Sequence, residues 1–91
     1  MKRNADKHEI KKRLVLVIAK LMEAKGLTQT AAADLIGIGR PDLSKYLGGN
    51  FRPVSMQRLL DVARGLGSDV EIKITVRPQS KRRGRLSLVM A

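Results

Sequence analysis

Polar and charged side chains gather between Arg40 and Lys45, and they are suited to hydrogen bonding rather than to breaking covalent bonds. The guanidinium group of Arg40 presents parallel N–H donors that match the O6 and N7 acceptors of guanine. In a helix, Ser44 and Lys45 lie on the same side as Arg40, one turn further along. We therefore expect Arg40, Ser44 and Lys45 to be able to read the edges of DNA bases.

Asp42 interrupts this basic set in the first turn of the same expected helix. A carboxylate repels phosphates, but it can accept a hydrogen bond from N4 of cytosine, so Asp42 is a fourth candidate for base contact. The alternative is a structural role, in which Asp42 stabilises the helix N-terminus or holds Arg40 or Lys45 in place. The residue types leave both roles open and favour the structural one slightly.

Catalytic and metal-binding chemistry is not expected. His8 is the only histidine of the chain, and there is no cysteine. Asp34, Asp42 and Asp61 do not have the paired spacing that acid–base catalysis or metal binding requires. We therefore expect no enzyme activity, no metal and no cofactor.

Two short helices must position the polar side chains. Thr28 is suited to cap a helix over 29–36, because its hydroxyl can accept from a free N–H of the first turn. Gly37 is suited to end that helix in a left-handed conformation, and Pro41 fits the first turn of a second helix over 40–47. The apolar residues expected to face inward are Ala32, Ala33, Leu35, Ile36, Ile38, Leu43, Tyr46 and Leu47.

The spacing of Ala33, Gly37, Leu43 and Tyr46 resembles the helix-turn-helix of the lambda-repressor-like (XRE/Cro) family, over residues 29–48. The resemblance implies a mostly helical bundle of four to five helices whose recognition helix spans 40–47. Phosphate contacts are then expected at the start of the first helix of the motif and in the loop after the second. The candidates for these contacts are Thr28, Gln29, Thr30, Asn50 and Arg52.

The charge of the chain agrees with an anionic partner. The 91 residues include 19 Lys and Arg and 8 Asp and Glu, which gives a formal net charge of +11. Double-stranded DNA is the first candidate for such a partner. RNA is less suited, because the chain has few aromatic side chains for stacking on bases.

Alternatives that involve a membrane are weaker. An amphipathic stretch from His8 to Lys25 has a basic face and could lie on a membrane, but so small a domain needs this helix for its core. The start of the chain lacks the apolar segment of a secretory signal, and no apolar run is long enough to cross a bilayer. We expect a cytoplasmic protein that associates with the nucleoid.

The chain divides into three parts by pattern. Residues 1–7 are expected to be a flexible basic N-terminus, and residues 8–68 a helix-turn-helix DNA-binding domain. A last helix of that domain begins after Ser55, another suitable cap, and ends near Gly65. Residues 69–91 are expected to hold a strand, a basic loop and a tail.

Strict alternation of apolar and polar residues predicts a β-strand from Val70 to Val76. A single strand leaves its backbone unpaired, so it needs a partner. A hairpin with the alternating residues 86–90 is one possibility, and the same strand of a second copy is the one we favour. The residues expected to form this dimer interface are Val70, Ile72, Ile74 and Val76.

The loop that follows the strand is basic, and its charged residues are Lys81, Arg82, Arg83 and Arg85. It is suited either to follow DNA phosphates as an arm or to keep an edge strand soluble, and the sequence does not separate these roles.

The wider stretch from Ile10 to Val76 resembles a compact subfamily of XRE regulators that includes antitoxins of HigBA-type toxin–antitoxin pairs. The residues that carry this resemblance are Gly26, Leu27, Thr28, Gln29, Gly37, Ile38, Leu43, Ser44, Tyr46, Leu47, Ser55, Arg58, Leu59, Val70, Glu71 and Ile72. The resemblance implies a homodimer that binds a palindromic operator, usually as a repressor. It also raises an alternative in which the chain binds and neutralises a toxin.

Overall fold

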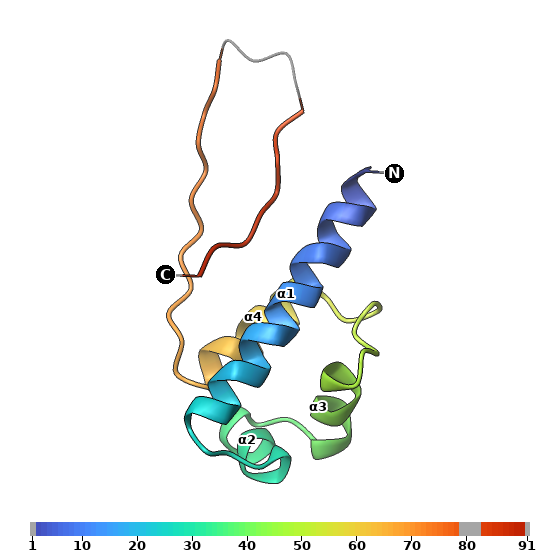
Figure 1. Ribbon diagram of the computed structural model, residues 1–91, viewed down its shortest axis with the longest axis vertical. Helices are drawn as coiled ribbons and strands as arrows, with labels where there is room; N and C mark the ends of the chain where they lie inside the picture. Colours follow the sequence, from blue (N-terminus) through green and yellow to red (C-terminus); the bar gives the residue numbers. More distant parts are fainter. Residues whose placement is uncertain (1, 79–82, 91) are drawn as a thin grey trace.

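The computed structural model describes residues 2–78 and 83–90, in which helices are followed by an extended C-terminal segment (Figure 1). The helices are α1 (Lys2–Ala24), α2 (Gln29–Ile36), α3 (Arg40–Leu47) and α4 (Met56–Gly65). The expectation of a mostly helical bundle is confirmed. α1 begins at Lys2, well before His8, so the backbone of residues 2–7 continues the first helix.

The helix boundaries follow the signals seen in the sequence. The hydroxyl oxygen of Thr28 accepts from the backbone N–H of Ala31 at 3.1 Å and caps α2. Ser55 caps α4 in the same way, accepting from the N–H of Arg58 at 3.0 Å. Gly37 ends α2 with a φ of 89°, a left-handed conformation that costs glycine little. The turn between α2 and α3 therefore has the expected chemistry.

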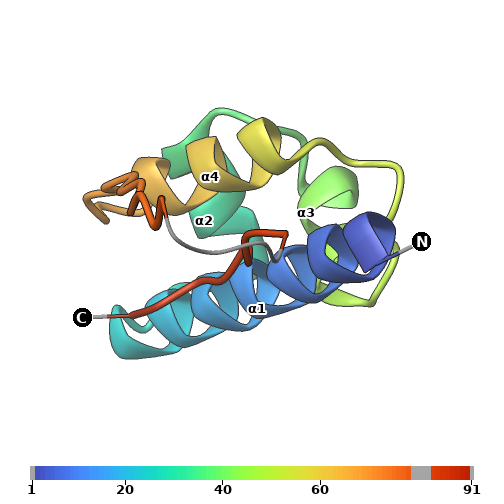
Figure 2. The same ribbon diagram turned by 90° about the horizontal axis from the view of Figure 1, so that it is seen from above.

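A single apolar core lies between α1 and the other helices. α1 packs along α4 and α3, and α2 packs against α3 and α4 (Figures 1 and 2). The residues least exposed to solvent include Ile18, Leu43 and Leu59, and Phe51 enters the core from the α3–α4 loop. The buried residues are Ile10, Leu14, Val15, Ile18, Met22, Ala32, Ala33, Leu43, Tyr46, Phe51, Leu59, Val62, Ala63 and Leu66.

Two details of α2 refine the expected core. Leu35, expected to face inward, is 57% exposed, so that expectation was wrong. Ile36 instead packs against Gly65 of α4, where a Cβ added to the glycine would lie 3.2 Å from the Cα of Ile36. α2 crosses α4 closely on the side that carries Ile36, so Leu35 lies on the opposite, exposed side of α2.

The expected strand from Val70 to Val76 does not form within the described residues. The segment is extended, but it makes no ladder with residues 83–90, so the alternative of a hairpin is not seen either. The physical reason is that a strand needs the backbone of a neighbour, and a single copy of the chain supplies none here. The apolar side chains of this segment remain exposed: Val70 38%, Ile72 80%, Ile74 85% and Val76 78%.

The last residues return to the bundle. Leu88 packs against the core as a half-buried residue, and its carbonyl oxygen accepts from Nη1 of Arg13 at 3.4 Å. Figure 2 shows this segment running over α1. Leu88 thus lies against the bundle, while residues 72–78 project from it (Figure 1).

Candidate nucleic-acid interface

α3 separates its side chains into an inner and an outer set. Leu43 and Tyr46 are buried, at 0% and 8% exposed, and they fix the rotation of the helix. Arg40 and Lys45 are exposed and Ser44 is half-buried on the other side. The spacing that suggested a base-reading surface therefore agrees with the way the helix is packed.

Asp42 is half-buried in the first turn of α3, where the positive end of the helix dipole stabilises a carboxylate. It forms no ion pair within the described residues, so the alternative in which it holds Arg40 or Lys45 by a salt bridge is not seen there. Its charge instead acts on Arg58 of α4. The pKa of Arg58 is raised, chiefly by its hydrogen bond from Nε to the Tyr46 hydroxyl oxygen at 3.5 Å and to a smaller extent by the Asp42 carboxylate.

The start of α2 offers donors of a different kind. The hydroxyl oxygen of Thr28 accepts from the N–H of Ala31 as the cap of α2. The hydroxyl hydrogen can still rotate and donate to a ligand outside the protein. Gln29 is half-buried, and its Oε1 is enclosed with no hydrogen-bond partner among the described residues. Thr30 is exposed. Together with the free N–H groups of the first turn of α2, these residues form a surface suited to a phosphate.

The loop after α3 is held from both sides. The N–H of Asn50 donates to the carbonyl of Lys45 at 2.8 Å, and Phe51 is buried beneath the loop. The ammonium group of Lys11 donates to the carbonyl oxygen of Arg52 at 2.9 Å. The side chains of Asn50 and Arg52 stay exposed, as a role in phosphate contact requires.

Lys11 was not among the candidate site residues, and nothing local in the sequence identifies it. It lies 41 positions from Arg52, so only the packing of α1 against the α3–α4 loop brings the two together. His8 reaches the same loop, where its ring stacks on Phe51 with centroids 5.5 Å apart. The first half of α1 is therefore part of the surface around this loop.

Other candidate residues lie elsewhere. Val70, Ile72, Ile74 and Val76 belong to the projecting segment and are not part of the α2–α3 surface (Figure 1). Of the basic loop, Arg83 and Arg85 are exposed, whereas Lys81 and Arg82 lie outside the described residues.

Neither a membrane span nor a metal centre emerges from the described part of the chain. None of its helices combines the length and the apolar character needed to cross a bilayer. No group of three His, Asp or Glu side chains comes together there as a metal ligand set would.

Comparison with known proteins agrees with this geometry. Residues 1–75 match the model of a helix-turn-helix domain family. A solved structure described as an XRE family transcriptional regulator is similar over 96% of this chain and 98% of its own, with a TM-score of 0.86 and 32% sequence identity. A comparison with curated proteins gave no match. Since both matches span most of the chain, the protein belongs to the XRE family of helix-turn-helix, DNA-binding transcriptional regulators.

Proposed function

We propose that this protein binds an inverted-repeat DNA operator as a homodimer and regulates transcription from it, as a repressor. The observation that carries the proposal is the exposed side of α3, on which Arg40, Ser44 and Lys45 lie opposite the buried Leu43 and Tyr46. A helix with a basic outer face and a packed inner face is the element that enters a major groove in this fold.

Each candidate contact has a role in this proposal. Arg40, Ser44 and Lys45 contact bases, and Asp42 either accepts from cytosine or orients α3. The start of α2 and the loop after α3 hold phosphates on the two sides of the groove, which positions the helix without reading sequence. The residues proposed for these phosphate contacts are Thr28, Gln29, Thr30, Asn50 and Arg52.

Dimerisation is proposed through the projecting segment. Ile72, Ile74 and Val76 are mostly exposed, and their backbone forms no ladder within the described residues. Pairing with the same segment of a second copy would satisfy the backbone and cover these side chains. Such a symmetric dimer binds two inverted half-sites about 34–36 Å apart, or about one turn of DNA.

The test of base reading uses the DNA upstream of the gene for this protein. Arg40→Ala is expected to weaken binding by ~1–3 kcal/mol and to relax specificity at one base pair, because the guanidinium fork contacts one guanine. Fluorescence anisotropy with operator duplexes that vary one base pair at a time measures both effects. Lys20→Ala, which removes an exposed charge from α1, is the matched control.

The outcomes are distinct. If Arg40→Ala weakens binding to operator and to random DNA by the same factor, Arg40 contacts phosphate and the base-reading role is wrong. If the unmodified protein binds operator and random DNA equally, sequence-specific regulation is wrong. Repression itself is tested with a reporter gene behind the operator, whose expression should fall when the protein is present.

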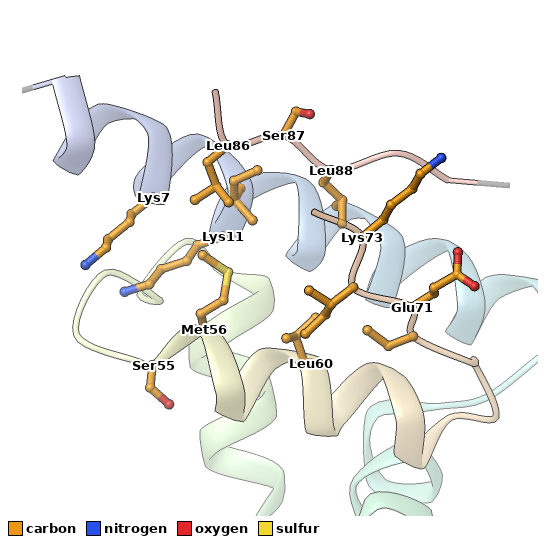
Figure 3. Close-up of a pocket in the computed structure, with 13 residues that line it drawn as sticks. Lys7, Lys11, Ser55, Met56, Leu60, Glu71, Lys73, Leu86, Ser87 and Leu88 are labelled. Carbon is orange, nitrogen blue, oxygen red and sulfur yellow. The ribbon is translucent and has the colours of Figure 1, made fainter. Parts of the chain in front are cut away.

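A second candidate function is that of an antitoxin, which neutralises a toxin by direct binding and regulates its own operon. The observation that favours it is an open hollow of about 600 Å³ between α1, α4 and the C-terminal segment (Figure 3). Its lining includes Ile10, Met56, Leu60 and Leu86, and no residue of α2 or α3, so a partner could bind there while α3 holds DNA.

Genetic context and co-purification test this alternative. A small open reading frame next to the gene should encode a protein that slows growth, and co-expression of the chain should restore growth. Substitution of Leu60 by Lys should abolish the rescue but leave DNA binding intact. The absence of a complex with the neighbouring gene product would rule out the antitoxin function and leave the regulator proposal in place.

A further inference from the structure

A small hollow lies where the first half of α1 meets the α3–α4 loop, and each described residue that lines it carries a nitrogen-bearing side chain. It has a volume of about 200 Å³, and its lining residues are Lys7, His8, Lys11 and Arg52. None of these described lining residues carries a carboxylate. The hollow is separate from the outer face of α3 and from the start of α2, which contribute no residue to it.

Packing, rather than chance proximity of long side chains, holds this hollow together. The Lys11 ammonium donates to the carbonyl oxygen of Arg52 at 2.9 Å. The ring of His8 stacks on Phe51 at an interplanar angle of 14°, and Phe51 is only 6% exposed. These two contacts attach the loop to α1 and hold the backbone of Arg52 at the hollow that Lys7 also lines.

No ion pair to Lys7, Lys11 or Arg52 forms among the residues that the structure describes. Within the described residues the ion pair that forms joins Arg64 and Asp61 on α4, away from this place. Nδ1 of His8 is enclosed, and no described residue forms a hydrogen bond with it. Cations brought together without a counter-charge repel one another, so an anion that binds among them is stabilised.

We infer that this hollow binds one phosphate group of the DNA backbone, so that the first half of α1 extends the grip of the α3–α4 loop on DNA. The inference rests on the proposed function. DNA is the favoured source of the phosphate because Arg52 lies two residues after Asn50, whose N–H is bonded to Lys45 at the end of α3. A phosphate held here belongs to the strand that borders the groove occupied by α3.

The donors suit such a ligand. A backbone phosphate offers two non-bridging oxygens, which can accept from the Lys7 ammonium and the Arg52 guanidinium at the same time. Lys11 is a positioning residue, because its ammonium is already bonded to the loop. His8 supports the loop through the stack on Phe51. This contact carries no information on base sequence.

The experiment measures how DNA affinity depends on salt. Lys7→Gln and Arg52→Gln should each reduce the slope of log K against log salt by about 0.9, the change expected for one lost phosphate contact. Each should also weaken binding to operator and random duplexes by the same factor. Lys20→Gln, which removes an exposed charge on another part of α1, should leave the slope unchanged. Equal slopes for Lys7→Gln and Lys20→Gln would overturn the inference.

A second measurement locates the phosphate. Operator duplexes with one uncharged methylphosphonate at a time should reveal a position where the unmodified protein loses affinity but Lys7→Gln loses no more. Such non-additivity means that the side chain and that phosphate contact each other. If the loss from Lys7→Gln and the loss from a methylphosphonate add at every position, the inference is wrong. This holds even if the variant and the modified duplexes each bind more weakly.

These outcomes separate the inference from the proposed function. If Arg40→Ala loses operator specificity while Lys7→Gln behaves like Lys20→Gln, the function stands and the phosphate site is wrong. If the unmodified protein fails to bind DNA, both are wrong. Inorganic phosphate is then titrated while the ring signals of His8 are followed by NMR, and a saturable shift without DNA binding would show a site for free phosphate instead.

Discussion

The helical bundle and the C-terminal segment differ in how far their apolar side chains are exposed to solvent. Among the described residues, the fourteen buried apolar ones lie between Ile10 and Leu66, whereas Ile72, Ile74 and Val76 are at least 78% exposed. The radius of gyration is 14.7 Å, above the ~12 Å of a compact domain of this length, because the segment projects from the bundle. The bundle buries most of its large apolar side chains, whereas those of the segment between Ile72 and Val76 remain exposed to solvent.

The largest expected effect distinguishes the two regions by stability. Leu59 is fully buried, so Leu59→Ala should lower the free energy of unfolding by about 2–5 kcal/mol through lost contacts and a residual cavity. Ile72→Ala, at a site that is 80% exposed, should change it by less than about 0.5 kcal/mol in dilute protein. Urea unfolding followed by circular dichroism measures both. Similar losses for the two variants would mean that the segment is part of the core.

The next effect concerns assembly. Ile72→Lys combined with Ile74→Lys would bury charges in the proposed dimer interface, so the protein should sediment as a monomer. Operator affinity should then fall by at least about 1.4 kcal/mol, a tenfold change, since only one half-site is held firmly. Analytical ultracentrifugation at micromolar concentration checks the first point and fluorescence anisotropy the second.

A matched control for this pair is Lys73→Gln, which lies on the opposite side of the same segment. It should leave the sedimentation coefficient unchanged. An unmodified protein that already sediments as a monomer would contradict dimerisation through residues 70–76.

The smallest expected effect is local to the helix-turn-helix. Thr28→Ala removes the oxygen that caps α2 and should cost about 1 kcal/mol of stability. Thr28→Ser keeps that oxygen and serves as the control. Thermal unfolding measures the difference, and hydrogen exchange at the N–H of Ala31 should report it at the residue concerned. Equal melting temperatures for the two variants would show that the cap does not contribute.

The parts of the fold that depend on near neighbours could be predicted from sequence. Thr28, Ser55 and Gly37 mark helix ends through hydrogen bonds that span three or four residues, and all three have the expected roles. The inward side of α3 followed from the spacing of Leu43 and Tyr46. Short-range chemistry is enough for such features because the residues that decide them are adjacent in the chain.

The features that the sequence did not predict depend on distant contacts. Leu35 has the spacing of a core residue, but the approach of Gly65 to Ile36 decides which side of α2 is covered. The contact of Lys11 with Arg52 joins residues 41 positions apart. The alternation from Val70 to Val76 is typical of a strand, but within the described residues no neighbouring backbone pairs with it, and the local pattern alone cannot supply that partner.

The division of α3 into a buried and an exposed side has a consequence for how such regulators diversify. Within the described residues the side chains of Arg40 and Lys45 make no hydrogen bond or ion pair to the rest of the protein, so replacing them leaves the core untouched. If Arg40 and Lys45 read bases as proposed, duplicated copies of the gene can acquire new operators by mutation at these positions without losing the fold. The same independence makes these positions a natural choice for randomisation when a binder for a chosen operator is sought.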